Sequence, residues 1–260
     1  MTDTTLLTET GAASVAERPA LPFGRLLAVE VRKLLDTRIS KILLAILAAL
    51  TVASITARGM VAGPDLELLV RTAAIGFGTL LPVLGILSVT SEWSQRTVLT
   101  TFALEPRRGR VLAAKCLPPL LLAVVASVTA IVVAVPVTAT VAMVQGEPAA
   151  WDVAPLALLG WTATNVLVVA MGMALGMLLL NAPAAIVICL STVVLWTGVG
   201  RLGSVGAFLT EWLALNTAAI PLAAADMTSG DLARLATAVT FWIVIPLTLG
   251  AVRVIRKEVR

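Results

Sequence analysis

The chain has 260 residues, of which 59% are hydrophobic and only 13% are charged. A soluble domain is usually about half apolar and about a quarter charged, so this composition excludes a water-facing surface over most of the chain. Histidine and tyrosine are absent and only two cysteines occur, which disfavours acid–base catalysis, metal binding and a disulfide framework. We therefore expect an all-α, polytopic membrane protein that binds no cofactor, metal or nucleic acid.

The first 21 residues form a polar segment. They include Asp3, Glu9 and Glu17, and they lack the basic start and apolar run of a secretory signal. A segment of this composition buries too little apolar surface to fold alone. We expect a disordered cytoplasmic tail over 1–21 and one membrane domain over 22–260.

The segment 22–38 predicts an amphipathic helix that lies in the membrane interface before the first span. At about 100° per residue, its apolar side chains share one half of the helix and Arg32 and Asp36 lie opposite. Glu30 projects into the apolar half. Local pairing with Arg32 or Lys33, or snorkelling of the side chain to the interface, would explain its position, and the alternative is that this face meets a protein partner.

Six segments reach or approach the roughly 20 apolar residues that a membrane-spanning helix needs. They cover about 39–57, 72–90, 111–144, 156–180, 184–201 and 235–253. The third contains Pro118, Pro119 and Pro136 and is too long for one perpendicular span. No polar turn divides it, so we expect a kinked or broken helix rather than two spans.

Lysine and arginine in the loops predict the orientation of the spans. With the N-terminus in the cytoplasm, all but four of the 19 basic residues lie on the cytoplasmic side; the exceptions are Arg58, Arg71, Arg201 and Arg234. We expect Arg71 and Arg201 to extend toward the outer interface. An odd number of spans would place the basic C-terminus outside, so we expect six spans with both termini inside.

Residues 91–110 form the one sizeable cytoplasmic loop between predicted spans. Ser91 can cap a helix whose first turn holds Glu92, and Trp93 indicates the depth of the interface. We expect this helix to end near Pro106 and to be followed by a basic turn of Arg107, Arg108 and Arg110. The basic residues alone would serve as a membrane anchor, whereas a capped helix of mixed polarity favours docking of a cytoplasmic partner.

Between the last two spans, residues 202–234 are too apolar for a free outer loop. We expect them to dip into the outer face of the membrane, shielded by the helix bundle or by a second copy. Within the spans, Asn165 predicts a helix–helix hydrogen bond more than a substrate contact, and Gly172 and Gly176 predict close helix packing. No acidic residue lies mid-membrane, which disfavours an ion-coupled carrier.

Two local patterns accompany this layout. Glu30-Val31-Arg32-Lys33-Leu34 is followed by Thr37-Arg38, and the later loop contains Glu92, Arg96, Thr97, Pro106, Arg107, Arg108 and Lys115 in that order. Together with the six spans they resemble the type-2 ABC exporter permease family, in particular its actinobacterial drug-exporter-like members. Arg96 stands where that family usually has a glycine.

The resemblance implies the transmembrane subunit of an ATP-driven exporter in a bacterial cell membrane. The helix over 22–38, with Glu30, Arg32, Lys33 and Arg38, would be the connecting helix. The loop would contain a coupling helix around 91–104 that docks on a separate ATPase, with Glu92 coupling the two subunits and the arginines contacting the ATPase or lipid. Two permease copies, or this chain and a paralogue, would form the pathway.

ATP hydrolysis would belong to the partner, because this chain has no G-x-x-x-x-G-K-[ST] phosphate loop. The partner would then hold the ATP and magnesium, and this chain would not be an enzyme. A non-transport membrane anchor or assembly factor is the alternative, because it too would use cytoplasmic helices to hold a partner. The sequence does not identify a substrate, although an apolar pathway suits an amphiphilic or lipid-like compound.

Overall fold

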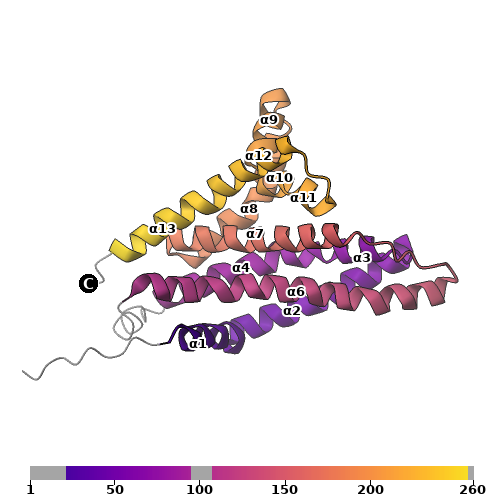
Figure 1. Cartoon of the computed structure of the whole chain (residues 1–260), viewed down its shortest axis with the longest axis horizontal. Coiled ribbons are helices and arrows are strands. Elements are labelled where there is room, and N and C mark those ends of the chain that lie inside the picture. Colours follow the sequence, from indigo (N-terminus) through magenta and orange to yellow (C-terminus); the bar gives the residue numbers. More distant parts are fainter. Residues whose placement is uncertain (1–21, 95–106, 257–260) are drawn as a thin grey trace, which may run out of the picture.

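A computed structural model describes residues 22–94 and 107–256, and the named elements within these ranges are all helices (Figure 1). They are α1 (Phe23–Asp36), α2 (Arg38–Ala62), α3 (Leu66–Thr72), α4 (Ala74–Ser94), α6 (Arg108–Gln145), α7 (Pro155–Leu179), α8 (Ala182–Val199), α9 (Gly203–Leu213), α10 (Leu215–Ala218), α11 (Ile220–Ala224), α12 (Ser229–Val239), the π-helical turn η1 (Thr240–Val244) and α13 (Ile245–Arg256). The predicted tail over 1–21 lies outside these ranges.

Six stretches of the described chain are helical, long and apolar enough to cross a membrane, which confirms the all-α, multi-pass prediction. The first, second, third and last of these stretches extend beyond the predicted apolar cores at both ends, whereas Pro155–Leu179 and Ala182–Val199 differ from theirs by only one or two residues. The second span covers Leu66–Trp93 because Asp65 caps it, its Oδ1 accepting a hydrogen bond from Leu68 N at 3.0 Å. The last covers Ser229–Arg256 because Thr228 and Asp231 form a capping box.

The third span is one helix, α6, of 38 residues, which confirms that this segment is one span rather than two and shows that the helix is not broken. Each internal proline removes one backbone hydrogen bond, but this loss is offset where the helix packs against others. Pro118 and Pro119 are buried in the bundle. Near its middle, Ser127 Oγ accepts a hydrogen bond at 3.0 Å from Asn165 Nδ2 of α7, which confirms the predicted helix–helix role of that asparagine.

The centre of the bundle is the contact between α4 and α7. A Cβ atom built on Gly172 would lie 2.7 Å from the carbonyl oxygen of Pro82, and one on Gly176 would lie 2.7 Å from Val89 Cγ2. Only a residue without a side chain allows this approach. The predicted close-packing face of α7 is therefore confirmed, and its partner is α4.

The segment after α8 is helical but bent. Gly203–Leu213 and Leu215–Ala224 meet at 70°, the geometry of a broken span or a re-entrant loop. The bundle shields its second half, because Gly160 of α7 approaches the backbone of Leu222 and Arg71 Nη2 donates to the carbonyl oxygen of Ala223 at 3.0 Å. Arg71 also pairs with Glu67, so its charge is compensated within the described helices.

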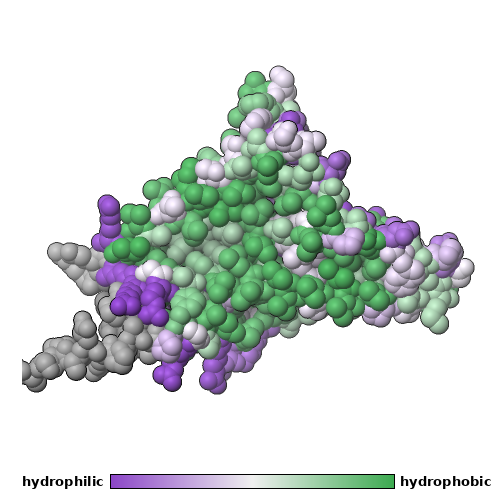
Figure 2. Space-filling view, in the orientation of Figure 1, coloured by the Kyte–Doolittle hydropathy of each residue, from purple (hydrophilic) through white to green (hydrophobic). Residues whose placement is uncertain are grey.

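The surface shows the same organisation. Figure 2 shows a broad hydrophobic region over the middle of the molecule, with hydrophilic residues gathered toward its two ends. In Figure 1, α1, the start of α6 and the end of α13 lie at the same end of the bundle. An even number of membrane crossings requires this arrangement of the two ends of the chain.

Candidate functional site

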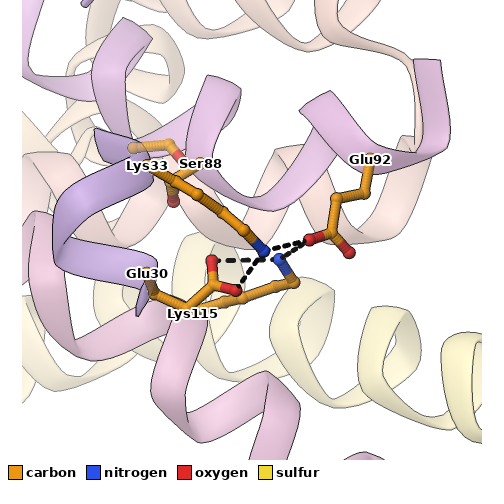
Figure 3. A network of polar contacts seen from close by, with 6 residues as sticks. Glu30, Lys33, Ser88, Glu92 and Lys115 are labelled. Carbon is orange, nitrogen blue, oxygen red and sulfur yellow. Dashed lines mark hydrogen bonds and ion pairs between the residues drawn. The ribbon is translucent and has the colours of Figure 1, made fainter. Parts of the chain in front are cut away.

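Four ionisable side chains from three helices meet at the end of the bundle where α1 lies (Figure 3). Lys33 Nζ of α1 lies 2.8 Å from Glu30 Oε1 and 2.7 Å from Glu92 Oε1 of α4. Lys115 Nζ of α6 lies 3.1 Å from Glu30 Oε2 and 2.8 Å from Glu92 Oε1. Each carboxylate therefore contacts both ammonium groups, and we call these four residues the charged cluster.

The charged cluster is largely shielded from solvent. Only 8% of the Lys115 side chain and 11% of the Glu30 and Glu92 side chains are exposed, whereas Lys33 is 45% exposed. Removing charges from water is costly, and the cost is offset only when partners and hydrogen bonds satisfy them. The alternation of two positive and two negative groups supplies that compensation.

The sequence of α1 explains how two members reach the cluster. Glu30 and Lys33 are three residues apart, so they share one face of the helix with buried Leu34. Thr37 then adopts an extended conformation, and its Oγ1 accepts a hydrogen bond from Ser40 N at 3.3 Å, which caps α2. This break separates α1 from the first span and lets α1 lie across α6.

The protonation state of Lys33 follows from its neighbours. Partial burial by itself lowers the pKa of Lys33, but hydrogen bonds and negative charges from Glu30 and Glu92 outweigh burial and raise this pKa above its ordinary value. The ammonium therefore stays charged at neutral pH. Asp36 lies on the exposed face of α1, where hydrogen bonds from Lys41 of α2 and from Arg32 hold the pKa of its carboxyl below its ordinary range.

Only some of the predicted site residues join the cluster. Arg32 is 84% exposed and pairs with Asp36, and Arg38 is exposed at the start of α2. Arg108 of the basic turn donates through Nη1 to the carbonyl oxygens of Val254 at 3.1 Å and Ile255 at 2.9 Å, so it ties α6 to α13. Arg107 and Arg110 lie beside it at the start of α6, and Trp93 is half-buried in α4. Arg96, Thr97 and Pro106 lie outside the described residues.

The predicted helix start at Ser91 is wrong. Ser91 and Glu92 lie inside α4, which the structure follows to Ser94. Hydroxyl residues there do not end the helix because they bond within it. Thr90 Oγ1 donates to the carbonyl oxygen of Ile86 at 2.7 Å, and Ser88 Oγ donates to that of Gly85 at 3.0 Å.

Lys33 is one of the two local partners that the sequence offered for Glu30, and the contacts with Glu92 and Lys115 were not predicted. Glu30 and Lys115 could have been noticed in the sequence, because each is a charged residue at a position where the pattern calls for an apolar one. Glu30 occupies the apolar half of an amphipathic helix, and Lys115 lies inside the long apolar run 111–144. Two opposite charges at apolar positions predict that they meet each other, and 85 residues separate them here.

The arrangement of the charged cluster connects three helices. Within residues 22–94 and 107–256, no group of three or more His, Cys, Asp or Glu side chains could hold a metal ion. The charged cluster instead fixes α1 to α4 and α6 through directional, charge-assisted hydrogen bonds. No protein-family model matches this chain, and a comparison with curated proteins finds no significant match.

Proposed function

We propose that this chain is the transmembrane permease subunit of an ATP-driven ABC exporter in a bacterial cell membrane. The observation that carries the proposal is the position of the charged cluster. Glu92 lies just before residues 95–106, Lys115 lies soon after them, and both bind the amphipathic helix α1. The two helices that flank the proposed coupling loop and the proposed connecting helix thus meet at one point.

A force on this loop would reach the bundle through the cluster. Displacing α4 or α6 separately from α1 would separate buried opposite charges, which is unfavourable. The three elements should therefore move together. Because α4 packs closely on α7 through Gly172 and Gly176, a movement that begins at the cluster would be transmitted to the centre of the bundle.

The partners follow from this role. A separate ATPase subunit would bind ATP and magnesium and dock on the loop that precedes Arg107. A second copy of this chain, or a paralogue, would complete the translocation pathway, and membrane lipids would surround the pair. The amphipathic α1, which exposes Val29 and Leu35 beside its charged residues, suits the boundary between lipid and cytoplasm.

The first test is purification of the full-length chain from its own host in mild detergent. A soluble ATPase with a phosphate loop should co-purify, and its ATP hydrolysis should be stimulated by the chain. Replacement Glu92→Gln, which removes a charge but little volume, should reduce this stimulation by at least about fivefold, the low end of a typical coupling free energy.

The matched control is Arg32→Gln, which removes an exposed ion pair on the opposite face of α1. Its stimulation of ATP hydrolysis should remain within about twofold of wild type, since exposed pairs contribute little. Unchanged stimulation in Glu92→Gln would refute the coupling role. Co-purification of a partner without a phosphate loop would favour a membrane anchor instead.

A further inference from the structure

A pocket lies where the bent segment after α8 meets the last span. Its volume is about 140 Å³, and side chains from α8, from the bend between α9 and α10, and from η1 line it. The lining includes Thr192, Trp196, Thr210, Asn216, Thr217 and Trp242. The charged cluster contributes no residue to it.

Trp196 brings a hydrogen-bond donor without a partner to the wall of the pocket. Its side chain lines the pocket, and its Nε1 atom is buried without a hydrogen-bond partner. A buried donor without an acceptor is costly, and nearly all such groups in folded proteins are satisfied by protein, water or a ligand. Because the atom is buried, the indole ring has to turn slightly for an acceptor oxygen in the pocket to reach it, and the hydrogen bond so formed would remove this cost.

The other polar groups present acceptors. Thr192 and Thr210 donate their hydroxyl protons to carbonyl oxygens of Cys189 and Gly206, at 2.7 and 2.9 Å. Their oxygen lone pairs remain available to a hydroxyl donor. No charged side chain among the described residues lines the pocket, and Met171, Val193 and Leu215 form apolar parts of its wall. The lining therefore suits an uncharged polar group that continues into a hydrocarbon.

The walls are held in place by specific interactions. Trp242 Nε1 donates to the carbonyl oxygen of Leu213 at 2.7 Å, directly beside the bend at Ala214. Arg234 Nη2 pairs with Glu211 at 3.2 Å, so α12 also holds α9. Trp242 lies in the π-helical turn, a local irregularity that is rare and frequently found at functional sites.

We propose that this pocket binds the uncharged polar end of a membrane-dissolved amphiphile, with Trp196 Nε1 donating to an oxygen of the ligand. Val193 at the pocket is 54% exposed on the surface of α8, so a hydrocarbon tail can leave toward lipid. A cavity of similar size, about 150 Å³, accommodates benzene in another protein. The pocket therefore accepts a hydroxyl, ester or amide group with a few attached carbons. The proposal concerns this pocket alone and stands whether or not the chain is a permease.

The test uses the full-length protein in lipid nanodiscs and a medium-chain alkanol that carries a photoactivatable diazirine. Labelling should saturate and should concentrate on peptides that contain residues 192–197, 210–217 and 242. Unlabelled alkanol should compete, whereas the alkane of equal length should not. Trp196→Phe keeps an aromatic ring but removes the N–H group, and it should raise the half-saturating concentration about threefold to tenfold, as expected for one neutral hydrogen bond.

The matched control is Trp161→Phe. Trp161 is the other described tryptophan whose buried Nε1 has no partner, but it stacks on Phe77 at 5.5 Å and does not line the pocket. The half-saturating concentration of the alkanol should be the same for this variant as for the wild type. Diffuse labelling of all lipid-facing helices, equal competition by the alkane, or an equal effect of the two substitutions would each overturn the proposal.

Discussion

Each charge of the cluster can be buried at low free-energy cost only because the other charges are present. Lys115 and Glu92 lie at a depth where an isolated charge would be unfavourable by several kcal/mol, and their 2.8 Å contact compensates both. The contribution of Lys33 to folding stability depends on pH. Because folding raises its pKa, its stabilisation is complete at neutral pH and is lost only as the pH rises through that raised value.

Truncation of one charge should therefore cost more than removal of a pair. We expect Lys115→Met to destabilise the protein by about 3–5 kcal/mol, because Glu30 and Glu92 then share only Lys33. Combining it with Glu92→Gln should recover part of this loss, since the cluster is again neutral. Thermal unfolding in detergent measures both effects, and a double variant less stable than Lys115→Met would contradict the compensation argument.

The sequence indicated the residues of this cluster, but it did not indicate that they contact one another. The pattern of α1 placed Glu30 on the inner face, and the loop pattern included Glu92 and Lys115. These residues come into contact because the chain breaks at Thr37 and because α1 packs against α6. Both are tertiary features, which helical periodicity does not encode. The same limit explains the error at Ser91, where hydroxyl side chains satisfied within α4 resemble a helix start in sequence.

Among the elements, α7 is the one around which the described helices are organised. Its glycines admit α4 on one side, and Gly250 of α13 approaches the backbone of Met177 and Leu178 on another. Small residues at helix contacts were predictable from sequence because close packing drives association in lipid. The continuity of α6 through three prolines was not, because the cost of a proline is local while the packing that offsets it is not.

The α4–α7 contact predicts that alanine substitutions at two glycines differ clearly in their effect on stability. Gly172→Ala would place a methyl group against the Pro82 backbone, where no flexible side chain can give way, so we expect a loss of about 1–3 kcal/mol in stability. Gly78→Ala, with nothing within 4 Å of the added atom, should be neutral or stabilising by up to about 1 kcal/mol. Equal melting temperatures for the two variants would contradict this packing.

At the scale of the whole molecule, hydrophobicity and charge distribution predicted the general plan. The six spans are present in the described chain, and α1 and the end of α13 lie at the same end of the bundle. A segment that dips into the membrane was predicted over 202–234 from its excess of apolar residues, and that dip stays a prediction; the 70° bend and the pocket beside it were not predicted. Both depend on contacts between segments far apart in sequence, such as that of Trp242 with Leu213.

The central claim is that the charged cluster couples α4 and α6, the two helices that flank the proposed coupling loop, to α1 by attraction between opposite charges. The most direct measurement is ATP hydrolysis by the proposed ATPase partner, purified with this chain, when all four charges are reversed together, as Glu30→Lys, Lys33→Glu, Glu92→Lys and Lys115→Glu. Glu92→Lys alone places three positive groups around Glu30 and should abolish stimulation. The fourfold reversal restores every opposite pair and should recover most of the stimulation. A fourfold variant that is as stable as wild type but no more active than Glu92→Lys would contradict the account.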